Sequence, residues 1–455
     1  MARKVLISFL GFSNYKECIY YKDGFESESL RFIQEATMDY LLTLEEWNAN
    51  DLAIILLTSG SKQRNWLDDG HVDPISKERI KQEGLQTRFK LKGYPFKVET
   101  IENLPDGKNE SELFEIFRQV YNVLENGDQL YFDITHGFRS LPMLALVLIN
   151  YAKFLKHIEV KSISYGNYEA HERIKDAEGN LLYVKAPIID LLPLSQIQDW
   201  TFAAADYLKN GNADKFSELL NSYKRSIFLG KRKGDKEMAI AIDGFVRTLN
   251  IVTDDFQTCR GKELLSQKNI KALKQKLNSL GETVIEPLNP VIQRINSAFM
   301  PFTEATTDND NLHNGFEAAK WCMNNNLYQQ AATILQEAIV SFFCSKHKLS
   351  LYAEEERKLV NGAFAKRYRL DSSIVTNEEK ECIRQEIEES NTLKELVNDE
   401  LICDKEINNA FAVITNERND INHSGMRMAP HSAKVIRDNI RHAFHVFVEK
   451  MEAKE

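Results

Sequence analysis

The sequence lacks any apolar run close to the roughly 18–20 residues that a membrane-spanning helix requires. Its first residues, Met1–Val5, lead straight into a strand-like segment and show no signal-peptide pattern of a charged start, an apolar stretch and a cleavage site. The six cysteines are widely spaced and form no C-x-x-C pair, which indicates neither a disulfide framework nor a cysteine-based metal site. We therefore expect a cytoplasmic protein without a resident metal or a membrane partner.

Excess positive charge is also missing, because the formal net charge is −9 at pH 7. This balance argues against a protein that coats nucleic acid by releasing counterions, although it leaves room for a local basic pocket. No G-x-G-x-x-G motif follows the first strand-like segment, which disfavours a dinucleotide-binding site. The chain also has no internal repeat and no low-complexity tract.

The chain does have enough length, 455 residues, for two or three domains. Its first 190 or so residues alternate strand-like and helix-like patterns, which predicts a Rossmann-like α/β domain with a parallel sheet covered on both faces. The expected strands are Lys4–Leu10, Asp51–Thr58, Phe96–Ile101, Gln129–Ile134 and Ile158–Tyr165. The expected helices are Leu30–Leu44, a segment around Ile75–Phe89, Glu110–Leu124 and Leu141–Leu155. A hairpin turn is expected at Asp176–Asn180.

After Pro193 the strand signals nearly disappear and a 3.6-residue periodicity takes over, which predicts an all-α second half. The expected domains are residues 1–193, a helical connecting region at 194–300 and a C-terminal helical domain at 301–455. The expected helices are Gln196–Lys209, Ala213–Leu229, Glu237–Val252, Ile270–Leu280, Leu312–Asn325, Gln329–His347, Glu378–Val397, Asp404–Asn419 and Ser432–Glu449.

Small polar residues, glycines and aromatics follow four of the expected strands. In open α/β sheets, ligands bind beyond the carboxyl ends of the strands, where backbone amides and helix N-termini can hold phosphate oxygens and aromatic rings can stack on bases. Any one of these loops could equally be an ordinary turn. The candidate ligand-binding residues are Gly11, Phe12, Ser13, Asn14, Thr58, Ser59, Thr135, His136, Gly137, Phe138, Arg139, Ser140, Tyr165, Gly166 and Tyr168.

The segment Arg418–His423 places a guanidinium five positions before an imidazole at the expected end of a helix. Arginine donates a planar fork of hydrogen bonds to phosphate, and histidine can move a proton near neutral pH, so the two together suit phosphodiester cleavage. A plain alternative is that Arg418 and His423 only complement the helix dipole. A second match, Arg437 and His442, lies inside the amphipathic last helix and is better read as a solvated face. The basic cluster from Lys224 to Lys236 is interpreted as a surface loop.

These motifs together resemble the CRISPR-associated CARF–HEPN ribonucleases, the cyclic-oligoadenylate-activated effectors of type III CRISPR systems. The resemblance covers essentially the whole chain: the strand-end loops resemble CARF ligand-binding elements, Asp199-Trp200 resembles the connecting region, and Arg418–His423 resembles the HEPN active-site motif. It implies an N-terminal CARF domain, a C-terminal HEPN domain and a homodimer, with a higher assembly as an alternative. It further implies a shared pocket for a ring of four, or alternatively six, adenylates as allosteric activator, and a composite cleft for single-stranded RNA.

In this interpretation Arg418, Asn419 and His423 are the catalytic residues of a metal-independent endoribonuclease that acts through the RNA 2′-hydroxyl. His136 and Ser13 lie where cleavage of the activator itself could occur. Two alternatives remain open: a non-catalytic nucleotide sensor whose helical half binds a partner, and a small-molecule enzyme on a Rossmann-like fold. The first lacks a recognisable DNA-reading helix-turn-helix, and the second lacks a cofactor fingerprint.

Overall fold

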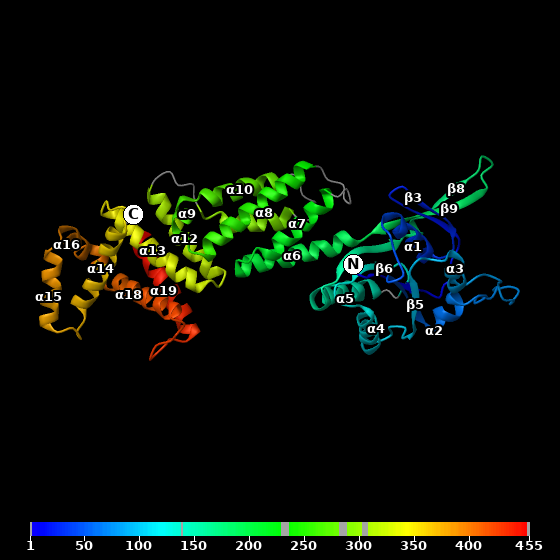
Figure 1. Ribbon diagram of the computed structural model, residues 1–455, viewed down its shortest axis with the longest axis horizontal. Coiled ribbons are helices and arrows are strands. Elements are labelled where there is room, and N and C mark those ends of the chain that lie inside the picture. Colours follow the sequence, from blue (N-terminus) through cyan, green and yellow to red (C-terminus); the bar gives the residue numbers. More distant parts are fainter. Residues whose placement is uncertain (1, 138–139, 229–235, 282–288, 303–307, 453–455) are drawn as a thin grey trace. The chain divides into compact units, whose positions relative to one another are not determined.

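The computed structural model describes residues 2–137, 140–228, 236–281, 289–302 and 308–452, which divide into two compact units at Gln196 and Ile197 (Figure 1). The first unit is α/β and the second is helical, as the sequence predicts. Within the described residues, no helix combines the length and the apolar character needed to cross a bilayer. The expected boundaries at residues 193 and 300 stay predictions.

The first unit is built on a nine-stranded sheet in the order β3-β2-β9-β7-β6-β1-β4-β5, with β8 paired to β9. The five strands from β5 to β7 are parallel and match the five predicted strands, whereas β9 runs antiparallel to β7. The predicted parallel arrangement is confirmed for these five strands, but the sheet as a whole is mixed. The strands are β1 (Lys4–Leu10), β2 (Cys18–Lys22), β3 (Phe25–Leu30), β4 (Leu52–Thr58), β5 (Lys97–Leu104), β6 (Gln129–Asp133), β7 (Glu159–Gly166), β8 (Glu172–Lys175) and β9 (Leu181–Asp190).

Helices cover both faces of the parallel strands, because alternate residues of a strand point to opposite faces. Val5, Ile7 and Phe9 of β1 are buried with α4 and α5, while Leu6 and Leu10 are buried with α1 and α3. The helices of this unit are α1 (Ile33–Leu44), α2 (Ser59–Ser61), η1 (Lys62–Trp66), α3 (Leu85–Lys92), α4 (Glu110–Val123), α5 (Leu141–Lys156) and η2 (Tyr168–Ala170).

Two helix predictions in this unit were partly wrong. The helix expected from Leu30 begins only at Ile33, because Leu30 ends β3 and pairs with Cys18 of β2. The helix expected around Ile75–Phe89 is confined to α3, and the residues before it form turns with an isolated bridge between Val72 and Arg79. The hairpin at Asp176–Asn180 is confirmed, since it joins β8 to β9.

The second unit is helical throughout its described residues. The helices, of which α6 begins just before the unit boundary, are α6 (Leu192–Asn210), α7 (Asp214–Phe228), α8 (Lys236–Gln257), α9 (Gly261–Ser266), α10 (Lys268–Gly281), α11 (Asn289–Phe299), α12 (Asp308–Asn324), α13 (Tyr328–Lys346), α14 (Glu354–Asp371), α15 (Asn377–Glu388), α16 (Asn391–Val397), α17 (Glu400–Cys403), α18 (Lys405–Asn422) and α19 (Ala433–Glu452). The sequence patterns missed α9, α11, α14 and α17 and merged α15 with α16. The chain breaks between these two where the Ser390 side chain caps α16 by accepting a hydrogen bond from Leu393 N.

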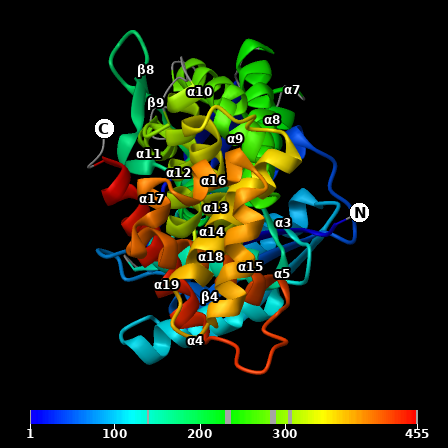
Figure 2. The ribbon, with the colours of Figure 1, turned by 90° about the vertical axis from the view of Figure 1, so that its left-hand side faces the viewer.

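One apolar cluster runs through this unit, from Trp200 on α6 to Phe447 on α19. Within it α13 packs against α12, α14, α18 and α19 (Figure 2). Phe364 of α14 stacks on Phe411 of α18, with ring centroids 3.9 Å apart. This packing fixes α18, the helix that carries Arg418, against the centre of the bundle.

Candidate functional site

Two groups of residues, one in each unit, have the chemistry of a site. In the first unit β1 lies between β4 and β6. Among the five parallel strands, the chain goes from β1 to β4 and β5 on one side of the sheet, and then to β6 and β7 on the other side. Strand order therefore switches between β1 and β6, and their carboxyl ends lead into the loops at Gly11 and Thr135. A switch point of this kind is the usual ligand crevice of an open α/β sheet.

Asp133, the last residue of β6, organises this crevice. Its carboxylate is fully buried and accepts hydrogen bonds from the Ser8 hydroxyl, over 2.6 Å, and from the Thr135 amide, over 3.0 Å. The Thr135 hydroxyl also donates to it and accepts from the Gly166 amide over 2.8 Å. Burial raises the pKa of Asp133. The contacts join the ends of β1, β6 and β7 into one polar cluster.

The loop after β1 folds back onto the loop after β6. Tyr15 stacks on His136, with ring centroids 4.2 Å apart and planes 19° from parallel. A Cβ on Gly11 would lie only 2.3 Å from the Tyr15 hydroxyl oxygen, so a glycine is needed for this close approach. Burial lowers the pKa of His136 to about 4, which keeps the imidazole neutral at neutral pH. His136 therefore offers a stacking surface and hydrogen bonds, without a positive charge.

Asn65 holds the loop after β1 in place through two hydrogen bonds to its backbone. Its side-chain amide donates to the carbonyl oxygens of Gly11, over 2.9 Å, and of Ser13, over 2.8 Å. Its own carbonyl oxygen lies 2.9 Å from Nε2 of His71, and both side chains are buried. Asn65 thus pairs with two backbone carbonyl groups of the loop, whereas the side chains of Phe12, Ser13 and Asn14 are exposed to solvent.

Thr58 and Ser59 lie beside this loop, where β4 leads into α2. The Thr58 hydroxyl accepts from the Ser61 amide and the Ser61 hydroxyl accepts from the Thr58 amide, which forms a capping box. A Cβ on Gly60 would lie 4.0 Å from Cβ of Phe12, so the two loops are neighbours. The Arg64 guanidinium stands 5.7 Å from the Phe12 ring centroid and adds a positive charge.

The structure brings together most of the predicted ligand residues that it describes: the loop after β1, the start of α2, Thr135, His136 and Gly166. Gly137 packs on Leu141, and Ser140 precedes α5 as its N-cap. Phe138 and Arg139 lie outside the described residues. The contacts found for Tyr165 and Tyr168 are with residues outside this group: the Tyr165 hydroxyl donates to Glu169 over 2.7 Å, and the Tyr168 ring stacks on His171.

The sequence patterns did not single out Tyr15 or Asn65 as part of this group, whereas Asp133 opens the candidate segment Asp133–Ser140. Asp133 carries a usable signal, because an acidic residue that ends an apolar strand needs a buried partner. Tyr15 follows Gly11-Phe12-Ser13-Asn14 directly, so an aromatic just past a candidate loop is a second usable signal. Asn65 carries none, since its role depends on a contact between segments that are more than fifty residues apart.

In the second unit the predicted catalytic residues lie at the C-terminal end of α18. Arg418 is partly buried, and its Nη1 lies 3.9 Å from Oε1 of Glu337 on α13. Its Nε is buried and finds no hydrogen-bond acceptor among the described residues. Glu337 also pairs with Arg357 over 2.5 Å and lines a cavity of about 380 Å³ between α9, α13 and α14. Arg418 thus keeps hydrogen-bond donors available while α13 limits its position.

His423 is the C-cap of α18 and is exposed, as is Asn419. The helix ends in a Schellman motif, in which the Gly425 amide donates to the Asp420 carbonyl and the Ser424 amide donates to the Ile421 carbonyl, both over 2.9 Å. Both Ser424 and Gly425 have positive φ. The predicted helix start at Asp404 is confirmed, because its side chain caps the Glu406 and Ile407 amides. The polar end of the helix is thus well defined and open to solvent.

The second match to the same spacing has a different setting. Arg437 and His442 are exposed within α19, and the Arg437 guanidinium stands 6.0 Å from the Tyr328 ring centroid.

Elsewhere on α18 and the segment after it, Glu417, Asp420 and His431 lie close enough together to hold a cation, which the sequence patterns did not suggest. In the basic cluster, Lys231, Arg232 and Lys233 lie outside the described residues, and Lys224 pairs with Asp243.

Comparison with known proteins finds similarity to CRISPR-associated proteins, with the family match in the first unit. Residues 5–169 match the family model described as CRISPR system endoribonuclease Csx1, CARF domain. The chain is also 25% identical over 272 residues to the CRISPR-associated protein MJ1674 of Methanocaldococcus jannaschii, over 58% of this chain. The chain spans only 37% of the length of that relative. Both findings support a CRISPR-associated chain with a CARF-type domain in its first unit. The family match contains every predicted ligand residue and ends well before Arg418.

Proposed function

We propose that the chain is a single-strand RNA endoribonuclease of type III CRISPR defence, activated by cyclic oligoadenylate. What carries the proposal is one combination: a CARF-type domain in the same chain as Arg418 and His423 at an exposed helix end. CARF domains in general bind ligands of the cyclic oligoadenylate type. The second unit would then be a HEPN domain, and two copies of the chain would bring their Arg418–His423 segments together in one cleft.

In the proposed reaction, the 2′-hydroxyl of the RNA loses its proton to solvent water and attacks the adjacent phosphorus, and the bond from phosphorus to the 5′-oxygen breaks. Arg418 donates hydrogen bonds to the non-bridging oxygens and stabilises the negative charge of the transition state. His423 gives a proton to the leaving 5′-oxygen, and Asn419 orients the phosphate. The products are a 2′,3′-cyclic phosphate and a 5′-hydroxyl. Because the nucleophile comes from the substrate and Arg418 stabilises the negative charge of the transition state, this chemistry needs no metal ion.

The activator is proposed to act through the dimer. If the ligand-free dimer holds its two clefts in an inactive arrangement, a ligand must prefer the active state by about 5.5 kcal/mol to move the equilibrium from 1:99 to 99:1. A ring that contacts the Gly11 and Thr135 loops of both subunits could supply this difference through phosphates, bases and ribose hydroxyls. The polar cluster around Asp133 supports this role, because it fixes both loops before a ligand arrives.

The test is cleavage of a fluorescent single-stranded RNA in the presence of cyclic adenylates of different ring size. We expect one ring size to activate, and His423→Ala to lower the maximal rate about 10²–10⁴-fold, the usual contribution of general acid–base catalysis. The matched control is His442→Ala, which removes the histidine of the second Arg-x-x-x-x-His match and should cleave like wild type. A 2′-deoxy residue on the 5′ side of the cut should abolish cleavage, and EDTA at 25 °C should not.

Three results would refute this mechanism: cleavage of the deoxy substrate, complete inhibition by EDTA at a temperature where the metal-free chain stays folded, or an unchanged rate in His423→Ala. A chain that binds a cyclic adenylate tightly but cleaves no RNA would instead favour the non-catalytic sensor. Mapping of product ends distinguishes the proposed reaction from contaminating nucleases, since many of these leave other termini.

A further inference from the structure

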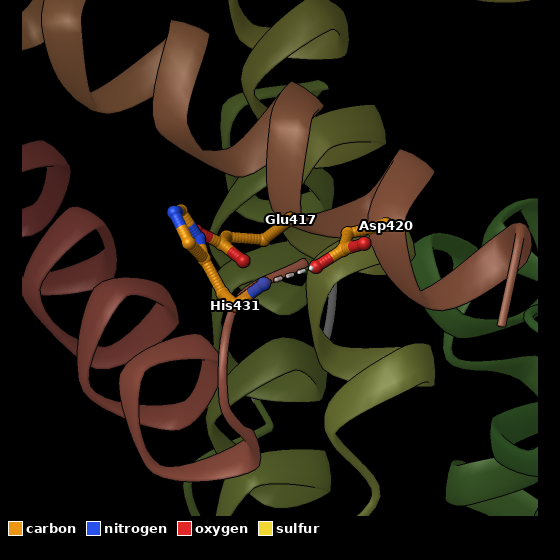
Figure 3. Close-up of side chains that lie close together, drawn as sticks. All are labelled: Glu417, Asp420 and His431. Atoms are coloured by element: carbon orange, nitrogen blue, oxygen red, sulfur yellow. Dashed lines mark hydrogen bonds and ion pairs between the residues drawn. The ribbon is translucent and has the colours of Figure 1, made fainter. Parts of the chain in front are cut away.

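Two carboxylates are buried side by side on α18: Glu417 directly precedes the segment Arg418–His423 and Asp420 lies within it. Glu417 is 0% exposed and Asp420 is 2% exposed. Their spacing of three residues places them on one face, toward the segment before α19 (Figure 3). Arg418, by contrast, contacts Glu337 of α13. Burial of two negative charges together is costly unless cations or hydrogen-bond donors compensate them.

Only two of the four carboxylate oxygens of Glu417 and Asp420 accept a hydrogen bond among the described residues. Oε1 of Glu417 accepts from Nδ1 of His431 and from the Asn439 side-chain amide, both over 2.7 Å. Oδ2 of Asp420 accepts from the backbone amide of His431 over 3.0 Å. Oε2 of Glu417 and Oδ1 of Asp420 are buried and accept no hydrogen bond among the described residues.

The positive charges beside the pair are weak partners for it. Nε of Arg427 lies 3.9 Å from Oδ1 of Asp420, too far for a hydrogen bond, and the Arg427 side chain is 38% exposed. Nη1 of Arg427 instead donates to the Asn416 side chain over 3.0 Å. His431 is charged only when it is protonated, and its side chain is 40% exposed. Within the described part of the chain, the arrangement thus leaves two buried carboxylate oxygens without a hydrogen-bond donor and without a close cation.

One ligand atom each from Glu417, Asp420 and His431 lies within 4.8 Å of the other two. Ligand atoms that share an ion at bond lengths of about 2.1 Å lie up to about 4.2 Å apart, so a small contraction would close the group around a metal. Two carboxylate oxygens and one imidazole nitrogen suit a transition metal better than Ca²⁺ or Mg²⁺, which prefer oxygen ligands throughout.

We propose that Glu417, Asp420 and His431 form a structural site for one divalent transition cation per chain, and that Mn²⁺ is among the ions that it binds. The bound ion neutralises the two buried carboxylates and joins the segment from Ser424 to Ser432 to α18. That segment follows His423 directly, so the ion stabilises the end of the helix. The site does not rest on the proposed ribonuclease activity.

The test is metal binding by the full-length chain after chelation and gel filtration. Mn²⁺ is the first probe, because exposed Cys382 competes for Zn²⁺ and thiols bind Mn²⁺ poorly. We expect electron paramagnetic resonance to show one tightly bound Mn²⁺ per chain, and added Mn²⁺ to raise the melting temperature. Asp420→Asn and His431→Gln should each weaken binding at least tenfold. The controls His442→Gln and Asp438→Asn alter exposed residues of α19 and should bind Mn²⁺ like wild type.

Asp420→Asn removes a buried charge at constant shape, so the metal-free variant should melt at or above the temperature of metal-free wild type. It should also lose the increase on adding Mn²⁺. Absence of Mn²⁺ binding by wild type, or equal binding by wild type and both site variants, would overturn the proposal. Because the readout is binding, failure here leaves RNA cleavage untouched, and loss of cleavage in His423→Ala leaves Mn²⁺ binding untouched.

Discussion

The hydroxyl of Ser8 donates a hydrogen bond to Oδ2 of Asp133 over 2.6 Å, although the two residues are 125 positions apart in the chain. They face each other in the register of β1 and β6, the two central parallel strands between which strand order switches. Both side chains are fully buried. The loops that begin three and two residues later are the ones that carry Gly11 and Thr135, so this bond sets the spacing of the candidate ligand site.

Asp133→Ala should destabilise the first unit and loosen both loops. The substitution leaves the Ser8 hydroxyl and the Thr135 amide and hydroxyl without their acceptor, and each buried unsatisfied group costs about 1–3 kcal/mol. We expect a loss of about 3 kcal/mol, which lowers the melting temperature of a domain of this size by about 6–12 °C. Differential scanning calorimetry measures the change. Asp106→Ala, at a partly exposed acid, is the control and should shift the transition little; equal shifts for the two variants would contradict this role.

His136 should titrate far below a solvated imidazole. Burial lowers its pKa to about 4, against about 6.5 for a solvated imidazole. The unfolded chain then binds this proton more tightly than the folded chain does, so the contribution of His136 makes the protein less stable as pH falls from about 6.5 toward 4. NMR of ¹³C-labelled histidines, with His136→Gln to assign the signal, measures the pKa. A midpoint near 6.5 for this signal would show that the ring is solvated and not held against Tyr15.

The parallel core of the sheet could be predicted because its strands are long apolar runs, as in β1 and β4, where nearly every residue is buried. The edge strands could not: Phe25–Leu30 has the sequence Phe-Glu-Ser-Glu-Ser-Leu, whose charges suit an exposed strand and resemble a loop. Thr135 and Gly166 were predictable because they lie at the carboxyl ends of β6 and β7, two adjacent parallel strands. The stacking of Tyr15 on His136 was not, because it depends on how one loop folds over another.

The end of α18 shows the same limit. Asp404 and the helix that follows it have clear capping and periodicity signals, and the exposed Arg-x-x-x-x-His end was predictable from the polar residues around it. The sequence patterns did not group Glu417 and Asp420 with His431. Their burial results from the return of the chain through His431 and the packing of Asn439 on α19, which no local pattern specifies.

Thr135→Val should separate activation from catalysis. The change keeps the shape of the side chain but removes the hydroxyl that donates to Asp133 and accepts from the Gly166 amide. If the ligand proposal holds, this variant needs more cyclic adenylate for half-maximal RNA cleavage, by about tenfold or more, and keeps its maximal rate. His423→Ala should show the reverse, with ligand binding kept and cleavage lost. Thr43→Val, at an exposed threonine of α1, is the control. The same phenotype in Thr135→Val and His423→Ala would contradict a two-site protein.

An exposed apolar stripe on α5 bears on the proposed homodimer. Met143 is 75% exposed, Val147 56% and Phe154 76%, and their spacing places them along one face of the helix that follows the Thr135 loop. Exposed apolar side chains grouped in this way commonly mark an interface. We predict that a second copy of the chain covers them, because a ligand pocket shared by two subunits would bring their Thr135 loops, and the helices that follow, close together.

Met143→Glu and Phe154→Glu should therefore weaken dimerisation at least tenfold, since each variant places a charge in an apolar contact. Analytical ultracentrifugation over a range of concentrations measures the dissociation constant. Ile75→Glu is the matched control, because Ile75 is 92% exposed in the same unit but lies outside α5. Cyclic adenylate binding should fall together with dimerisation in the α5 variants and stay intact in the control. If both α5 variants remain dimers as tight as wild type, the subunits meet through another surface, and the stripe requires a different partner.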